Sequence, residues 1–339
     1  MSFRVRPVRS GDFQAIYEMA KLTGGGFTNL PPDKGALVDK LVRSEHGFSR
    51  EEDTPADDMF MMVLENVETG QIRGTCQIFA QVGTEWPFYS YRISTLSQTS
   101  KALGRTFRAE MLTLVTDFDG CSEVGGLFLH PGERAGGLGM LLARSRYLFI
   151  KLHRARFAAK LIAELRGVID EAGASPFWDA IAGKFFGMTF QEADEFNAVH
   201  GTQFIADLMP KTPVYTAMLP ESARAVMGVP HPSGRAAMRM LEKEGFVHDC
   251  YVDIFDGGPT MVANTDQIRT IRESREHKIG AVSKAEDGQS MMLARGRLND
   301  FAACYGEVCS NEDGSITIDP TAAEMLGVGE GDTVLAMGR

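Results

Sequence analysis

The sequence predicts an α/β protein in which a mixed central sheet carries helices on both faces. Three observations support this fold class. Segments with helical and with strand periodicity follow one another along most of the 339 residues. The chain is 44% apolar and 24% charged, which is typical of a globular protein with a buried core. Residues 122–160 combine a short apolar strand, a glycine-rich turn and an amphipathic helix, in that order.

Residues 122–160 are the most informative part of the chain. The apolar strand ends at Leu129, and the turn that follows contains Gly136, Gly137 and Gly139. From there to Lys160, leucine and phenylalanine residues recur at i, i+3 and i+4, so one stripe of the helix faces a core. Glycines let the main chain approach a ligand closely, and the first N–H groups of a helix attract anions. This order of elements therefore predicts a phosphate-binding loop.

A run of basic residues favours the same ligand class. The chain carries a net charge of −10, yet no Asp or Glu occurs from residue 134 to residue 160. The basic residues of this run are Arg134, Arg144, Arg146, Lys151, Arg154, Arg156 and Lys160. Positive charge concentrated in an acidic chain indicates a polyanionic ligand at that place. The alternative is that the later basic residues complement the helix C-terminus, which leaves Arg134 unexplained.

The elements before this stretch follow from periodicity and capping. Ser10 or Asp12 can cap the helix that follows the first strand. The expected elements are a strand at 3–8, helices at 13–21 and 33–44, a hairpin of 59–65 and 72–82, a strand close to 86–92, and a short helix with a loop within 98–120.

After the basic run, the pattern predicts a strand at 159–167 and an insertion at about 168–230. The insertion is expected to hold helices near 176–186 and 191–199 and strands near 203–208 and 214–218. A helix at 233–244 and strands at 250–255 and 260–263 complete a main domain of residues 1–277. A small polar linker, 278–290, is expected to join it to a small C-terminal β appendage, 291–339.

Composition limits the protein's class. No apolar run approaches the roughly 20 residues of a membrane span, and the N-terminal segment lacks a signal-peptide core. The pI near 5.3 argues against general nucleic-acid binding. Five cysteines without a CxxC pair or a Cys/His ligand spacing predict a reduced, cytoplasmic protein without a metal site.

The loop Arg134-x-x-Gly137-x-Gly139 resembles the acyl-CoA loop of the GNAT superfamily of N-acyltransferases, which implies the acyl-CoA N-acyltransferase (GNAT-like) fold. Longer segments across residues 3–275 look like the arginine N-succinyltransferase family. The segments that carry this resemblance are residues 24–31, 163–167, 175–178, 206–210, 229–232, 242–246 and 253–259.

The resemblance implies transfer of succinyl from succinyl-CoA to the α-amino group of L-arginine, which gives N2-succinyl-L-arginine and CoA. In that family this reaction opens a catabolic route from arginine to glutamate and ammonia. It implies succinyl-CoA as co-substrate and no permanently bound cofactor. Two alternatives remain: another acyl donor or amine, such as ornithine, or one subunit of a paired-chain enzyme. A homodimer or pairing with a similar subunit is therefore expected.

The resemblance also implies roles for particular residues. Leu127 and Leu129 on the strand, with Arg134, Gly136, Gly137 and Gly139 in the loop, are expected to contact the acyl-CoA. Many superfamily members carry a proton-donating tyrosine where this chain has Leu241. The family's proton-donor histidine falls on His231 by this resemblance, and imidazole, which titrates near neutral pH, can give a proton to a departing thiolate. Tyr251 is the second candidate, and the alternative for His231 is a helix-capping role.

The substrates that the resemblance implies are charged at both ends, so the pocket needs charged groups to bind them. Candidates for the guanidinium ligand are Glu164, Asp170, Asp117, Asp119 and Glu123. Arg166 can meet a substrate carboxylate or form a structural pair with Glu164, because alternate residues share one face of a strand. Trp86, Tyr89 and Tyr91 either wall the acceptor pocket or belong to the core.

Overall fold

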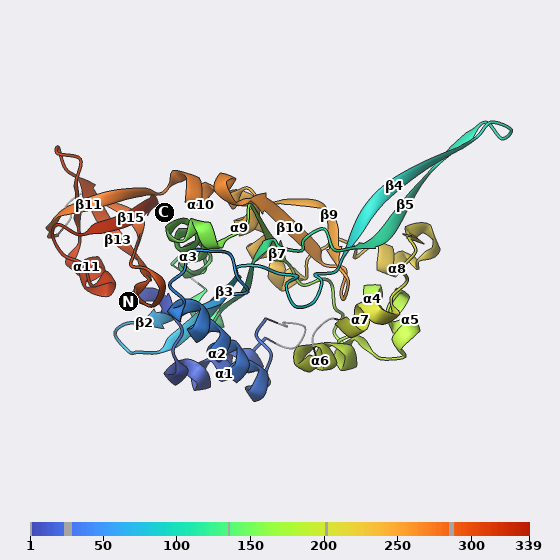
Figure 1. The fold of residues 1–339 in the computed structure, drawn as a ribbon, viewed down its shortest axis with the longest axis horizontal. Helices are drawn as coiled ribbons and strands as arrows, with labels where there is room; N and C mark the ends of the chain where they lie inside the picture. The colour runs from blue at the N-terminus through green and yellow to red at the C-terminus, as the bar shows by residue number, and fades with distance from the viewer. Residues whose placement is uncertain (1, 24–28, 135, 201–202, 285–287) are drawn as a thin grey trace.

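The computed structural model describes residues 2–23, 29–134, 136–200, 203–284 and 288–339. The strands in these residues join in one fifteen-stranded mixed sheet, with helices on both faces of its central part (Figure 1). The strands are β1 (Phe3–Pro7), β2 (Met59–Asn66), β3 (Ile72–Phe79), β4 (Ser90–Ser100), β5 (Arg105–Val115), β6 (Ser122–Leu129), β7 (Lys160–Glu164), β8 (Val214–Tyr215), β9 (Val247–Asp253), β10 (Pro259–Asn264), β11 (Arg275–Val282), β12 (Gln289–Arg295), β13 (Ala302–Ser310), β14 (Ile316–Ile318) and β15 (Thr333–Gly338). Their order in the sheet is β12-β15-β11-β14-β13-β1-β2-β3-β6-β7-β10-β9-β4-β5-β8.

The α-helices lie at the positions that connect these strands. They are α1 (Phe13–Lys21), α2 (Lys34–Ser49), α3 (Leu138–Leu152), α4 (Pro176–Ala180), α5 (Gly183–Phe186), α6 (Phe190–His200), α7 (Gln203–Leu208), α8 (Glu221–Arg224), α9 (Arg235–Glu244), α10 (Arg269–Glu273) and α11 (Pro320–Leu326). No helix in the described part of the chain is long and apolar enough to cross a bilayer.

Strand β2 shows why both faces of the sheet are covered. Its sequence is apolar almost throughout, as expected of a strand with no solvent-facing side. Met59 and Met61 face the core that α1 and α2 complete, whereas Phe60 and Met62 face the core that contains α3. The ring of Phe60 lies 4.9 Å from that of Phe149 on α3, centroid to centroid. The expected arrangement of helices on both faces is confirmed.

The sheet opens between β6 and β7. These parallel strands pair only at Ser122 with Leu161 and at Glu123 with Ile162. Further along, a β-bulge places Gly126 and Leu127 of β6 opposite the single residue Cys76 of β3. A bulge bends its strand, so the edge of β6 beyond Glu123 turns away from β7.

The insertion is helical where the sequence suggested helices, with α4, α5 and α6 close to their expected bounds. Residues 203–208 form the helix α7, so the strand predicted there was wrong. The side-chain amide of Gln203 donates to Asp207, four residues on, at 2.7 Å. Phe204 packs against Phe186 and Phe196 of neighbouring helices. These contacts stabilise a helix at 203–208 in place of the predicted strand.

Residues 90–115 form a long hairpin, where a short helix and a loop were expected within 98–120. Strands β4 and β5 pair without interruption from Ser90 with Val115 to Ser100 with Arg105. The hairpin projects far from the body of the molecule (Figure 1). Most of its outer residues are exposed and polar, so the apolar alternation that marks a strand in a sequence is missing.

The C-terminal strands continue the main sheet. Residues 275–282 form β11, where a linker from residue 278 was expected, because Ile279 is buried in the C-terminal core. Strands β11 to β15 and α11 share that core, and β13 pairs with β1 through Cys304 and Ala303. The edge of the N-terminal strand is thereby covered.

Candidate active site

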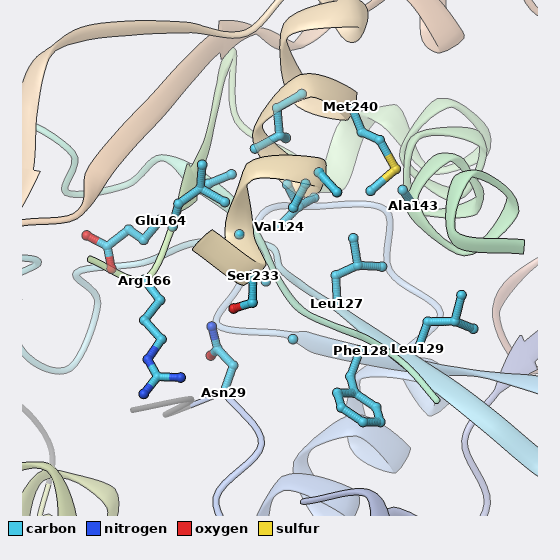
Figure 2. A pocket seen from close by; sticks show the side chains of 18 of the residues that line it. Asn29, Val124, Leu127, Phe128, Leu129, Ala143, Glu164, Arg166, Ser233 and Met240 are labelled. Atoms are coloured by element: carbon cyan, nitrogen blue, oxygen red, sulfur yellow. The ribbon is translucent and has the colours of Figure 1, made fainter. Parts of the chain in front are cut away.

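A cavity of about 800 Å³ follows the open edge of β6. Its walls come from β6, from β7 and the residues just after it, from α3, from α9 with the segment that leads into it, and from α6. Figure 2 shows Glu164 and Arg166 toward one side of it, Leu129 and Ala143 toward the other, and Leu127 and Ser233 between them. The cavity thus joins the glycine loop to a charged end.

At the first end, the glycine loop leads directly into α3. Gly137 caps the helix with φ of +79°, and Gly136 before it has φ of +66°, a conformation that other residues adopt at a cost. Arg134, Gly137 and Gly139 line the cavity, whereas Gly136 is not among the lining residues. The first N–H groups of α3 have no carbonyl acceptor within their own helix, so they favour an anion at this end.

The C-terminal strands contact this loop. The hydroxyl of Tyr305 on β13 donates to the carbonyl oxygen of Gly137 at 3.0 Å. The guanidinium of Arg339 lies over the Tyr305 ring, 4.4 Å from its centroid, and donates to the carbonyl of Gly136. The C-terminal segment therefore stabilises the loop between β6 and α3 through these two hydrogen bonds.

The middle of the cavity is the backbone of β6. Leu127 and Leu129 both line it, as do Gly125 and Gly126. Gly126 has φ of +57°, and a Cβ there would lie 2.6 Å from the side chain of Gln77. Glycine is thus required for the bulge that exposes this edge.

His231 stands beside the charged end. Its backbone N–H donates to the carbonyl of Arg166 at 2.7 Å, which ties the segment before α9 to the end of β7. Its Nδ1 is 2.7 Å from Ser233 Oγ, and the Ser233 N–H points to the same Nδ1 at 3.3 Å. Burial and the nearby charge of Arg166 lower the pKa of His231. The neutral ring is therefore favoured, and His231 also caps a short 3₁₀ turn, as the alternative interpretation expected.

The charged end is defined by Glu164, Arg166, Asp253 and Asp256, which all line the cavity. Burial, and then repulsion by Asp253, raises the pKa of Asp256 to about 8. Burial followed by the charges of Asp253 and Glu123 raises the pKa of Glu164 well above its usual value. Burial lowers the pKa of Arg166. Several ionisable groups are thus placed where the charged form is costly.

The basic run does not form one anion-binding surface. Arg134, Arg144 and Arg146 line the cavity, but Arg144 is buried and donates to Glu244 at 2.7 Å. Most of the later basic residues bind other parts of the fold: Lys151 the carbonyl of Ile271, Arg154 the carboxylate of Asp266, and Arg156 that of Asp53. The charge count overstated the anion site because it could not distinguish these structural pairs.

Several predicted site residues lie elsewhere. The hydroxyl of Tyr251 donates to Asp117 at 2.8 Å, and neither residue lines the cavity. The other candidates outside the lining are Asp119, Asp170, Glu123, Trp86, Tyr89 and Tyr91. Tyr91 is buried in the core of the insertion, whereas Trp86 is exposed. Of the five candidate guanidinium ligands, the cavity therefore contains Glu164.

Sequence reasoning missed other lining residues. Asp253 and Asp256 lie in a segment that the sequence marks only by family resemblance, and Asn29 follows a glycine-rich segment, 24–28, that lies outside the described residues. Arg146 belonged to the basic run, and its guanidinium is 3.4 Å from the carbonyl of Gly125. The carboxylates carry no local signal, since any turn contains such residues.

Comparison with known proteins places the chain in a family. A family model described as arginine N-succinyltransferase beta subunit matches residues 3–270, and a second, described as the C-terminal domain of that subunit, matches residues 275–338. An arginine N-succinyltransferase of Citrobacter koseri is 43% identical over 271 residues, which are 80% of this chain and 78% of that protein. One of Salmonella arizonae is 43% identical over 301 residues, 88% and 87% of the two chains.

A solved structure agrees with these matches. Subunit AI of the arginine/ornithine succinyltransferase of Pseudomonas aeruginosa superposes with a TM-score of 0.91 at 32% identity, over 99% of this chain and 98% of that chain. The match covers nearly the whole chain, the C-terminal strands included, so the predicted fold class is confirmed. The chain belongs to the arginine N-succinyltransferase family of acyltransferase enzymes.

Proposed function

We propose that this enzyme transfers the succinyl group of succinyl-CoA to the α-amino group of L-arginine, giving N2-succinyl-L-arginine and CoA. The observation that carries the proposal is the continuous cavity from the glycine loop, along the open edge of β6, to His231 and the charged end. A CoA thioester is long, anionic at one end and reactive at the other, and the cavity has this distribution of groups. The reaction would begin the breakdown of arginine to glutamate and ammonia.

In this proposal the glycine loop and α3 bind the CoA phosphates. The N–H groups at the start of α3 and the side chain of Arg134 supply positive potential there. The pantetheine arm lies along β6, where the bulge leaves main-chain groups near Leu127 and Leu129 free of β7. The thioester carbonyl then lies close to Leu127, and the backbone N–H groups of this edge stabilise the oxyanion.

His231 is the proposed proton carrier. In the tautomer that carries the proton on Nδ1, Nδ1–H donates to Ser233 Oγ at 2.7 Å and no longer accepts the Ser233 N–H. Nε2 is then unprotonated and has no hydrogen-bond partner among the described residues. It can then accept the proton that the amine loses as its nitrogen forms a bond to the thioester carbon. The C–S bond breaks, and the imidazolium gives the same proton to the departing thiolate. No external proton is consumed.

A direct assay tests the function. The purified protein is incubated with succinyl-CoA and L-arginine, and free thiol and the succinylated product are measured. Thiol release that requires the amine supports the proposal, and no release with either arginine or ornithine refutes it. Thiol release without an acylated amine indicates thioester hydrolysis and also contradicts it.

Ornithine is the second candidate acceptor, because the solved relative is named an arginine/ornithine enzyme. The relative is also named a subunit, and the family model is named after a beta subunit, which supports an assembly of this chain with itself or with a similar chain. The molar mass in solution and the activity of the isolated chain test this part. A cytoplasmic location is included in the proposal because all five cysteines are free thiols.

A further inference from the structure

The charged end contains two side chains of opposite charge with unused hydrogen-bonding capacity. Glu164 is the last residue of β7 and Arg166 lies two residues further, so the two project to the same side of the extended chain. Both line the cavity, and Figure 2 shows them on the same side of it. The structural pair between them that the sequence allowed is not formed among the described ion pairs.

Arg166 forms no ion pair among the described residues, although the charges of Asp256 and Asp194 act on it. Its Nε is buried and makes no hydrogen bond. The Asp256 carboxylate, which is one of its acidic neighbours, is engaged elsewhere: its oxygens accept the N–H groups of Gly167 at 2.6 Å and Gly258 at 2.8 Å. Arg166 is half-buried, and a buried Nε–H without an acceptor costs folding free energy, so a carboxylate ligand with two oxygens would satisfy it.

Glu164 is the complementary case. Its Oε1 is buried and makes no hydrogen bond. Asp253 is occupied, because its Oδ1 accepts the N–H groups of Phe255 at 2.7 Å and Asp256 at 2.8 Å. Of the charged end's three carboxylates, Glu164 is the one with a buried oxygen that accepts no hydrogen bond. A cation placed there would restore its ionised form.

The charged end also lies next to the residue that is proposed to carry the proton. The backbone carbonyl of Arg166 holds the N–H of His231 at 2.7 Å, so the charged end adjoins the proposed proton carrier. Both substrates of the proposed reaction place a charged group within a few bonds of the carbon and nitrogen that react. Charges fixed beside His231 would orient the amine and the acyl chain.

We propose that Arg166 binds a substrate carboxylate and that Glu164 binds the side-chain cation of the acceptor. This inference rests on the proposed succinyl transfer. The carboxylate has two sources with the same chemistry, the free end of the succinyl group and the α-carboxylate of the amino acid. Glu164 and Arg166 thereby determine specificity rather than carry out a chemical step.

Substrate pairs that differ by one charge test the proposal. Butyryl-CoA matches succinyl-CoA in chain length but lacks its carboxylate, agmatine lacks the α-carboxylate of arginine, and citrulline lacks its positive charge. The kcat/KM ratios within these pairs are compared for the wild type, Arg166→Gln and Glu164→Gln. Arg224→Gln and Glu221→Gln on α8 are matched controls, since both residues are exposed and outside the cavity.

Arg166→Gln is expected to lower one carboxylate preference by about tenfold or more, as expected when a charged hydrogen-bond partner is lost. A fall in the succinyl-to-butyryl ratio assigns Arg166 to the acyl chain, and a fall in the arginine-to-agmatine ratio assigns it to the acceptor. Glu164→Gln is expected to lower the arginine-to-citrulline ratio by a similar factor. Arg166→Lys keeps the charge but loses the planar guanidinium, so its carboxylate preference should lie between those of the wild type and Arg166→Gln.

Ratios unchanged within about twofold in Arg166→Gln and Glu164→Gln would overturn the proposal, if the wild type is active. Calorimetric titration of arginine and citrulline into the CoA-bound protein provides a readout that needs no turnover. Weaker arginine binding in Glu164→Gln supports the assignment even where the wild type fails to turn over succinyl-CoA. That failure contradicts the proposed function alone, whereas equal binding of arginine and citrulline contradicts the role of Glu164.

Discussion

The hydroxyl of Tyr305 donates a 3.0 Å hydrogen bond to the carbonyl of Gly137, the residue that caps α3. The two residues are separated by 168 positions in the sequence. The same carbonyl accepts the N–H groups of Met140 and Leu141, so Tyr305 fixes a group on which the first helical turn depends. The C-terminal strands thus stabilise the loop that we assign to the CoA phosphates.

Tyr305→Phe is expected to weaken acyl-CoA binding without changing the chemical step. Loss of one neutral hydrogen bond lowers the binding free energy by about 1 kcal/mol, which corresponds to a roughly fivefold higher KM for succinyl-CoA. The kcat at saturation should remain near the wild-type value. Tyr89→Phe, which alters a tyrosine outside the cavity, is the control. A lower kcat with unchanged KM would contradict a positioning role for Tyr305.

Gly137→Ala is expected to disrupt the loop itself. A Cβ at this position would lie 2.7 Å from Nη2 of Arg339, and the residue has φ of +79°. Gly70→Ala is a close control, because Gly70 has a similar φ of +70° and no atom within 4 Å of the added Cβ. Both variants should lose about 1–2 kcal/mol of unfolding free energy to backbone strain. Only Gly137→Ala should bind CoA more weakly, as measured by calorimetry.

The glycine loop and its contact with Tyr305 show what the sequence can and cannot predict. The strand, loop and helix around Gly137 follow from local periodicity, because their hydrogen bonds are local. Contacts such as Tyr305 with Gly137 depend on how distant strands pack, and no local pattern records them. The outer part of the hairpin 90–115 was missed because most of its residues are polar and exposed. Asp253 and Asp256 were missed as site residues because turn carboxylates are common on any surface.

The buried pair of Arg144 and Glu244 is expected to matter for stability more than for binding. Arg144 Nε and Glu244 Oε1 are 2.7 Å apart, and the second oxygen of Glu244 accepts the N–H of Thr270 at 2.8 Å. Glu244→Gln leaves a buried guanidinium without its charge partner, so the free energy of unfolding should fall by about 3–5 kcal/mol. Denaturant titration measures this. Glu273→Gln, which alters an exposed pair with Arg269, should leave the free energy of unfolding nearly unchanged.

His231→Ala is expected to lower kcat by about 10²–10⁴-fold while leaving the dissociation constant of acyl-CoA nearly unchanged. The reason is that His231 is hydrogen-bonded to the charged end through the carbonyl of Arg166. His46→Ala on α2 is the control, because His46 is exposed and remote from the cavity. Unchanged turnover in His231→Ala would remove the role of proton carrier and leave only the capping of the turn at Pro232.

The pH dependence of the reaction links His231 to Arg166. His231 must be neutral to accept the amine proton, so activity should rise with pH through its pKa. Burial and the Arg166 charge lower that pKa, which places the acidic limb of kcat/KM below the ordinary histidine value of about 6.5. Arg166→Gln removes a positive charge that opposes protonation, so the limb should move toward higher pH. Arg224→Gln should leave the limb in place. If the acidic limb stays at the same pH in Arg166→Gln, His231 is not the group that titrates. If the limb moves to lower pH, the two side chains do not repel each other.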